Sequence, residues 1–406
     1  MAGAVSYFVG QSQYTLYAAG DSDNPAFGDD GSNSYSGTQE YPVALKTAIQ
    51  GKIAKIAAPQ LRTYGSPRAV LTESGRIFSW GANGNGHFIG LLATPQLITN
   101  PVTDGWENVF TGYERMVAVT SSGLLYANGS ERQRGIADLD TVTATLDLID
   151  NSQDWSGSKV WIGPEITYVL DKFGSVHWFG QHDYTVLGDP GVVDNIYSPG
   201  VHLLTTDVKD IYPTINGIFH IKNDVSGFEG ELKYGGTAGT DVPSSFLADG
   251  YHDITDCVST GGWREFLYRS EITNNAVLVL KDNGDYYYWG EAVGPAVFGD
   301  GLSQLNDGAQ TYDEPVFHSG GWEHLSSALS WAAFGLKTDG FVLGWGEDSE
   351  LLPLGTGDFA YRQTTPAAVG DPGLSDIDPP KIIQNEPRYP LLSEVSRSAS
   401  GEFNLP

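Results

Sequence analysis

The segment SGRIFSWGANGNGHFIG, from Ser74 to Gly90, decides how the chain is interpreted. It holds a turn pair, a short strand-like run, a Trp-Gly pair and a loop rich in glycine. Three of its glycines, Gly84, Gly86 and Gly90, give it the look of a phosphate-binding loop. Such a loop presents the phosphate to the N-terminus of a helix, and no helical segment follows here. We therefore interpret these glycines as turn residues.

The same arrangement recurs along the chain. A turn glycine is followed six positions later by a second glycine, which usually comes after an aromatic residue. The first copy is degenerate, because Tyr14 stands where the turn glycine is expected. The second glycines are Gly20, Gly81, Gly129, Gly180, Gly236, Gly290 and Gly346, at intervals of 48 to 61 residues. Seven copies at such a period indicate an array of small units rather than two or three ordinary domains.

Each unit has the pattern of a small antiparallel sheet of about four strands. Asn-Gly and Asp-Gly pairs between apolar runs are strong hairpin signals, because the favoured two-residue turns need a positive φ. The apolar runs before the turns are Ala69–Thr72, Met116–Thr120, Thr167–Leu170, Ala276–Leu280 and Ala332–Leu336. The turn pairs include Ser74-Gly75, Asn283-Gly284 and Asp339-Gly340. A further strand, often opened by an aromatic residue, is expected upstream, at Gly105–Phe110, Asp154–Gly163, Tyr251–Ser259 and Gly321–Ser326.

A four-stranded unit of this size cannot bury both of its faces alone, but units stacked around an axis can. The sequence therefore predicts an all-β fold, a seven-bladed β-propeller with four-stranded antiparallel blades, in which residues 1–369 form one domain. The content of 51 Gly, 10 Trp, 21 Tyr and 17 Phe is typical of short strands and tight turns. The first copy lacks a complete upstream strand. We expect the extended, proline-containing tail, residues 370–406, to complete it, with Lys381–Gln384 as the candidate strand and a neighbouring molecule docked on the tail.

The repeat resembles the RCC1-like repeat. Trp80-Gly81, Trp289-Gly290 and Trp345-Gly346 match its aromatic-Gly pair best, and the resemblance covers roughly residues 4 to 369. Ala19-Gly20 and Asn128-Gly129 depart from the pattern. Propellers of this kind include nucleotide-exchange factors, ubiquitin-ligase modules and an enzyme inhibitor. The resemblance implies recognition of other proteins, and no exchange-factor residue can be carried over position by position.

The charge is strongly one-sided, with 22 Lys+Arg against 50 Asp+Glu and a formal net charge of -28. Such a surface repels phosphate backbones, so we expect no nucleic-acid partner. Two interpretations of the acidity stay open. It keeps a large protein dissolved, or it attracts a basic partner.

The sequence predicts no cofactor, no metal site and no catalytic group. A single cysteine, Cys257, rules out an internal disulfide and a zinc site of several cysteines, and we expect it to be buried in the strand Tyr251–Ser259. The acidic loop Asp21–Asn33 lacks the alternating ligands of a calcium loop, and the eight histidines lack ligand spacing. The N-terminus lacks a signal-peptide pattern, and no apolar run predicts membrane insertion.

We therefore expect the chain to function through contacts between its surface and other molecules. The segment Gly261–Asn275 has the pattern of an insertion in the sixth blade and is rich in aromatic residues and arginine, the residue types of interface hot spots. Its candidate partner-binding residues, and those of the tail Ser396–Pro406, are Trp263, Arg264, Phe266, Tyr268, Arg269, Phe403 and Leu405. Extra core packing in an enlarged blade explains the insertion equally well. The polar connection Asp21–Lys52 is a second expected excursion.

Three hypotheses of function follow. The leading one is a non-enzymatic scaffold for protein–protein interactions, most plainly a structural subunit of a bacteriophage virion, of decoration, tail or fibre type. Its partners would be other subunits and a host-surface receptor or glycan, and its location the virion, otherwise the cytoplasm. The alternative is a soluble regulatory propeller of guanine-nucleotide-exchange-factor type that binds a basic protein. The third is a glycan-binding or glycan-cleaving propeller. Partner, organism, copy number and working face stay open.

Overall fold

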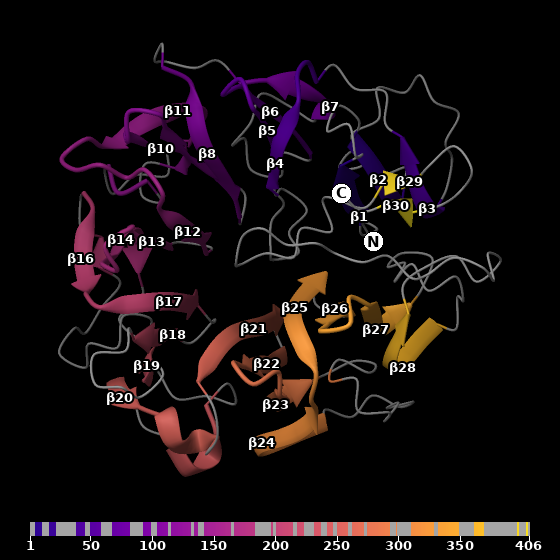
Figure 1. Cartoon of the computed structure of the whole chain (residues 1–406). Coiled ribbons are helices and arrows are strands. Elements are labelled where there is room, and N and C mark those ends of the chain that lie inside the picture. The colour runs from indigo at the N-terminus through magenta and orange to yellow at the C-terminus, as the bar shows by residue number, and fades with distance from the viewer. Residues whose placement is uncertain are drawn as a thin grey trace.

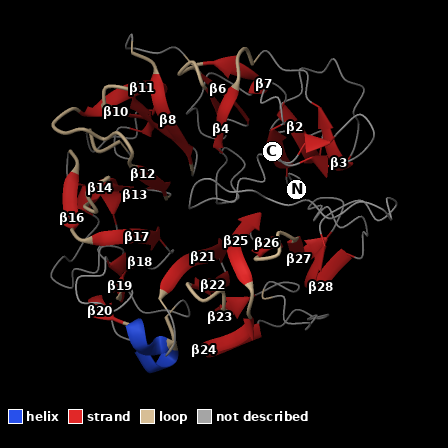
Figure 2. Ribbon diagram, viewed as in Figure 1, coloured by secondary structure: helices blue, strands red, loops and turns tan. Residues whose placement is uncertain are grey.

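The computed structural model of the chain consists almost entirely of β-strands, with two short 3-10 helices among its described residues (Figure 2). The structure describes residues 5–9, 16–21, 38–44, 49–57, 67–81, 92–98, 104–112, 115–130, 134–136, 142–163, 166–182, 196–197, 200–213, 217–222, 231–236, 242–246, 250–258, 262–271, 274–292, 298, 310–328, 332–348, 361–368, 396–397 and 403–404.

Seven antiparallel sheets follow one another around a ring in chain order (Figure 1). The first sheet contains β1 (Val5–Val9), β2 (Leu16–Asp21) and β3 (Thr38–Ala44). The second contains β4 (Ile53–Ala57), β5 (Arg68–Thr72), β6 (Ile77–Gly81) and β7 (Leu92–Leu97). The third contains β8 (Trp106–Thr111), β9 (Met116–Thr120), β10 (Leu125–Ser130) and β11 (Val142–Asp150).

The fourth sheet has five described strands, because both β15 and β16 pair with β14. Its strands are β12 (Lys159–Ile162), β13 (Ile166–Leu170), β14 (Val176–His182), β15 (Ile196–Tyr197) and β16 (His202–Thr205). The fifth sheet contains β17 (Val208–Pro213), β18 (Gly217–Lys222), β19 (Leu232–Gly236) and β20 (Gly250–Asp253), with the helices η2 (Ser244–Phe246) and η3 (Thr255–Cys257) beside it.

The sixth sheet contains β21 (Trp263–Glu271), β22 (Asn274–Lys281), β23 (Tyr286–Ala292) and β24 (Gln310–Ser319). The seventh contains β25 (Trp322–Ala328), β26 (Ala332–Lys337), β27 (Val342–Asp348) and β28 (Tyr361–Ala368). A separate pair, β29 (Ser396–Arg397) and β30 (Phe403–Asn404), lies in the tail. In these sheets, the first strand lies toward the middle of the ring and the last lies outside (Figure 1). The predicted all-β propeller is confirmed, with one described sheet for each repeat.

The core of the protein lies between successive sheets rather than inside any one of them. Along β22, Val277 and Val279 pack toward the β17–β20 sheet, while Ala276, Leu278 and Leu280 pack toward the β25–β28 sheet. Both faces of the strand are therefore buried, which explains why its sequence is a continuous apolar run instead of an alternating one. The second strands β9 and β18 follow the same rule.

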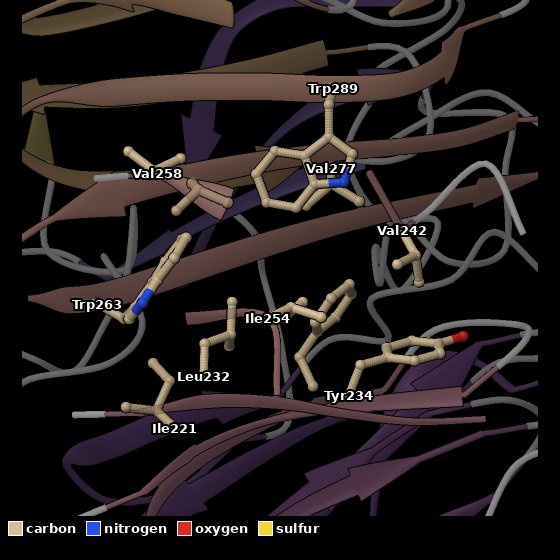
Figure 3. Close-up of a cluster of buried hydrophobic side chains, with 11 residues drawn as sticks. Ile221, Leu232, Tyr234, Val242, Ile254, Val258, Trp263, Val277 and Trp289 are labelled. Atoms are coloured by element: carbon tan, nitrogen blue, oxygen red, sulfur yellow. The ribbon is translucent and has the colours of Figure 1, made fainter. Parts of the chain in front are cut away.

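One such cluster shows how two neighbouring sheets interlock. Trp263 on β21 and Trp289 on β23 face Ile221, Leu232 and Tyr234 on β18 and β19 (Figure 3). Both tryptophans are 1% exposed or less. Large aromatic rings on the first and third strands fill the space between neighbouring sheets. A buried aromatic side chain removes roughly 150–250 Å² of surface from water.

A backbone contact joins four of the described turns to the chain that leads into the next sheet. The N–H of Trp106 donates to the carbonyl oxygen of Gly75 at 2.9 Å, and the N–H of Trp322 donates to that of Gly284 at 3.0 Å. We call this contact the turn latch. It also joins Trp155 to Gly123 and Val208 to Gly174. Two constraints require glycine at the turn. Its φ is positive, and an added Cβ would lie too close to the backbone that leads into the next sheet.

The second glycine of the repeat marks a β-bulge between the third and fourth strands. At Gly81, Gly290 and Gly346, φ is positive, and the pairing with the outer strand skips the tryptophan before each glycine. A bulge kinks the strand and re-aims a side chain, and these tryptophans are buried in the core. In β10, Asn128 takes the place of the aromatic residue, and its Oδ1 accepts the N–H of Met116 at 2.6 Å.

The outer strands carry a feature that the sequence analysis missed. Proline occupies β3, β7, β24 and β28, at Pro42, Pro95, Pro315 and Pro366. Proline has no N–H to donate, so a foreign strand cannot add to these edges in full register. The sequence signal for an outer strand is thus a proline 14 to 25 positions after the second glycine of the repeat.

Most of the expected strands form where the pattern placed them. The five apolar runs before the turns become second strands, and the segments led by Trp106 and Trp322 become first strands. The first sheet has three described strands. The completing strand Lys381–Gln384 lies outside the described residues, as do most of the tail and the greater part of the loop Asp21–Asn33.

Four boundaries were wrong. The strand expected at Asp154–Gly163 begins only at Lys159, because residues 151–158 form a turn. Tyr251–Ser259 is not a first strand, since Gly250–Asp253 closes the preceding sheet and a 3-10 helix follows. Gly261–Asn275 is therefore no insertion, because it supplies β21, the first strand of its own sheet. The connection Asp21–Lys52 contains β3, which pairs with β2.

The turn latch can be tested by adding one methyl group. Gly284→Ala places a Cβ 2.9 Å from the carbonyl oxygen of Trp322, at a residue whose φ is +83°. We expect a loss of about 2–4 kcal/mol in the free energy of unfolding, from backbone strain plus the clash. Urea-induced unfolding measures this loss.

Gly157→Ala is the matched control. Its φ of +72° is similar, but the nearest atom to the added Cβ, on Lys172, lies at an ordinary 3.7 Å. We expect only the strain of about 1–2 kcal/mol. Equal losses in the two variants would show that the close approach of neighbouring sheets is not what requires the glycine.

Candidate interaction face

The hairpin turns between second and third strands gather at one end of the ring. Each turn latch brings such a turn against the link that leads into the next first strand. Turns and links therefore form one surface, which we call the turn face. Its described turns are residues 72–76, 120–124, 171–175, 281–285 and 337–341, and its links are residues 104–105, 150–158, 205–208, 253–258 and 319–321.

Side chains hold these turns in shape. Thr72 Oγ1 accepts the N–H of Arg76 at 3.1 Å, and Thr120 Oγ1 accepts that of Leu124 at 3.0 Å. The carboxylate of Asp171 does the same for the N–H of Ser175 at 2.9 Å. Because the turns are closed by hydrogen bonds and latched to the next sheet, the turn face is a rigid surface, which lowers the entropy cost of binding.

Exposed charge on the turn face is mostly negative. Among the described residues of these turns and links, the exposed base is Lys172, while the exposed acids are Glu73, Asp104, Asp154, Asp207, Asp253, Asp256, Asp282 and Asp339. Lys172 already forms an ion pair with Asp154. Other bases turn inward, since Lys281 lies over the ring of Trp263 at 3.7 Å and Lys337 over that of Trp322 at 3.9 Å. The result is an acidic surface.

The link 150–158 carries the densest polar network of this face. Lys172 Nζ donates to Asp154 Oδ2 at 2.6 Å and to Ser156 Oγ at 3.1 Å. Glu107 Oε1 accepts the N–H of Gly157 at 2.9 Å, and Asp150 Oδ2 accepts the indole N–H of Trp155 at 2.8 Å. The hydrogen bond from Lys172, followed by those from Ser156, holds the pKa of Asp154 well below its ordinary 3.8. This carboxylate is therefore charged at every physiological pH.

The other strongly shifted groups are shifted mainly by burial. Burial lowers the pKa of His220 to about 3, with the charge of Lys222 adding to the effect. Burial also raises the pKa of the Cys257 thiol to about 12 and raises the pKa of Tyr168. A cysteine of this kind is a poor nucleophile at neutral pH. Cys257 lies in η3, not in a strand, and is partly buried against a core cluster.

No metal cluster or membrane-spanning helix is found in the described part of the chain. Among those residues, no three His, Cys, Asp or Glu side chains come together to hold a metal ion. None of the helices there is long and apolar enough to cross a membrane.

The residues predicted for partner binding do not lie together on this face. Trp263 is 1% exposed and belongs to the core, so it supports the blade instead of offering a surface. Phe266, Tyr268 and Arg269 lie along β21 and pair with Val279, Val277 and Ala276 of β22. Arg264 is partly buried, and its carbonyl oxygen lies 3.3 Å from Tyr212 Oη. Phe403 lies in β30, and Leu405 is outside the described residues.

Comparisons with known proteins agree with this architecture. No family model matches the chain. The Regulator of chromosome condensation of Mus musculus is 27% identical over 198 residues, which cover 43% of this chain and 45% of that relative. The Protein RCC2 homolog of Xenopus laevis is 28% identical over 126 residues, which cover 29% of this chain and 24% of that relative. The chain spans less than half the length of these curated relatives.

Two solved structures share the fold over nearly the whole chain. Prp20p from Saccharomyces cerevisiae, studied for its binding properties to Gsp1p and histones, matches with a TM-score of 0.64 and 16% identity, covering 91% of this chain and 89% of Prp20p. Human WBSCR16 matches with a TM-score of 0.63 and 14% identity, covering 92% of this chain and 95% of that protein. The chain is an RCC1-like repeat propeller.

The network around Asp154 gives a direct electrostatic test. Lys172→Met removes the ammonium group that donates to Asp154 and keeps the length of the side chain. We expect the pKa of Asp154 to rise toward its ordinary value, because the charged form loses its main partner. Carbon-detected NMR titration of the carboxyl group measures the shift. Lys52→Met, which removes an exposed partner of Glu73 elsewhere on the ring, is the control and should leave Asp154 unchanged. An unmoved pKa in Lys172→Met would contradict the assignment.

Proposed function

We propose that this chain is a non-enzymatic protein-interaction propeller that binds a basic protein through its acidic turn face. The observation that carries the proposal is the charge of that face. Its exposed acids far outnumber its exposed bases, and the chain as a whole carries a net charge of -28. A rigid surface of one sign steers a partner of the other sign and rejects like-charged competitors.

The relatives support a protein partner. Prp20p is described together with its binding to Gsp1p and histones, and a second structure shows yeast RCC1 (Prp20) bound to Kap60. A histone is the kind of basic protein that an acidic face would attract, so histones are the natural first probe. None of these relatives supports the virion role expected from the sequence, and we do not carry that role further.

The proposal predicts binding that depends on salt and on one face only. We expect a purified histone dimer to bind the chain, with an affinity that falls as ionic strength rises. The variant Asp282→Lys/Asp339→Lys reverses the charges of two exposed acids on hairpin turns of the turn face. It should weaken binding about tenfold at low salt, at roughly 0.2–1 kcal/mol for each lost pairing. Isothermal titration calorimetry measures the affinity.

Glu291→Lys/Asp313→Lys is the matched control. It makes the same change in net charge, but toward the opposite end of the β21–β24 sheet, where β23 finishes and β24 begins. We expect it to alter histone affinity much less than the turn-face variant. If both variants weaken binding equally, only net charge matters, and the turn face has no special role.

A second candidate activity is guanine-nucleotide exchange, which the RCC1-like resemblance implies. The naming of Gsp1p as a binding partner of Prp20p favours it. We expect the chain to accelerate the release of a fluorescent guanine nucleotide from Gsp1p, measured by stopped-flow fluorescence. An unchanged release rate would remove the exchange activity and leave the histone proposal standing.

A further inference from the structure

The five described hairpin turns of the turn face differ at the residue before the turn glycine, which is polar in four turns and aromatic in one. The residue before the turn glycine is Ser74, Ser122, Asn283 or Asp339 in four of them, and Phe173 in the fifth. Serine, asparagine and aspartate favour turns because their side chains hydrogen-bond the local backbone. Phenylalanine offers no such bond, so its presence needs another explanation.

In the other turns, this position does structural work. Ser74 Oγ lies 3.0 Å from Thr72 Oγ1, and the Oδ1 atom of Asn283 accepts the N–H of Asp285 at 3.0 Å. In the turn with Phe173, Asp171 Oδ1 accepts the N–H groups of Phe173 and Ser175 at 2.8 and 2.9 Å. The turn closes through the aspartate, and the side chain of residue 173 is released from any part in it.

Phe173 projects into solvent. Its exposed fraction is 76%, above that of every other large exposed apolar residue in the described part of the chain. Those others, apart from Ile136, lie on the outer strands, at Leu97, Leu148, Leu203 and Phe317. An exposed aromatic ring on a rigid turn contributes nothing to folding, and aromatic residues are typical anchors of protein interfaces.

Two neighbouring links bring carboxylates to the turn that carries the ring. Asp154 pairs with Lys172, whose Nζ is 5.4 Å from the centre of the Phe173 ring. The latch between Gly174 and Val208 brings the link that contains the exposed Asp207 to the same turn. An aromatic face beside carboxylates matches the guanidinium group, which stacks on rings and pairs with carboxylates through its planar fork.

We propose that Phe173, on a turn whose neighbouring links carry Asp207 and Asp154, is a docking site for an arginine side chain of a basic protein partner. This inference rests on the proposed function and names the contact that selects the partner. Charge complementarity brings the basic segment to the turn face, and the exposed ring then distinguishes arginine from lysine. A lysine ammonium is a compact, strongly hydrated charge that stacks less well.

The test uses the full chain and two fluorescent peptides of equal length, with arginine or lysine at the same positions. We expect Phe173→Ser to weaken binding of the arginine peptide about fivefold and to change binding of the lysine peptide much less. Phe173→Tyr keeps the ring and should keep the affinity. Fluorescence anisotropy at low salt measures binding, and thermal unfolding should be unchanged in Phe173→Ser, because Ser122 occupies the same position in the preceding sheet.

Phe317→Ser is the matched control, since it removes an exposed phenylalanine from β24 on the rim. It should bind both peptides as the unaltered protein does. Unchanged arginine-peptide binding in Phe173→Ser overturns this inference alone. An equal loss for both peptides overturns the selection of arginine. Failure of the unaltered protein to bind either peptide overturns this inference together with the proposed function.

Discussion

The whole ring depends on one backbone contact, the turn latch, in which the carbonyl oxygen of a turn glycine accepts the N–H that opens the next sheet. The contact needs a positive φ and the absence of a Cβ at the same residue, as at Gly75 and Gly284. It sets the spacing between neighbouring blades. It also fixes the start of the next sheet, so that a tryptophan such as Trp106 or Trp322 is buried between the two neighbouring sheets.

The latch matters because no sheet here is stable by itself. Alternate residues of a second strand belong to different core clusters, as Val277 and Leu278 do on β22. Each sheet therefore leaves two apolar faces to be covered, and only its two neighbours can cover them. A ring built this way has little internal freedom. Its turns are consequently fixed in position relative to one another, which is what a recognition surface requires.

The candidate site was only partly accessible from the sequence. The acidity and the absence of catalytic motifs pointed to recognition. The segment around Trp263 was expected to be an insertion, with a contact surface and extra core packing both left open. It is instead a first strand, whose Trp263 packs in the core between two sheets. Phe173 carried a readable signal, a phenylalanine where the other turns have serine, asparagine or aspartate. Superposing the repeats position by position would have found it, whereas its exposure could not be read from a single sequence.

The sequence by itself determined the fold class and the number of repeats, because glycines with positive φ, apolar runs and turn pairs are local requirements that recur at intervals of 48 to 61 residues. It also determined the sign of the charge. Only the tertiary structure decided the phase of the blades, assigning Gly250–Asp253 to one sheet and Trp263–Glu271 to the next. It alone decided which polar and aromatic side chains share a face. The physical reason is that burial and proximity arise between sheets, from residues distant in the chain, and a local pattern contains no record of them.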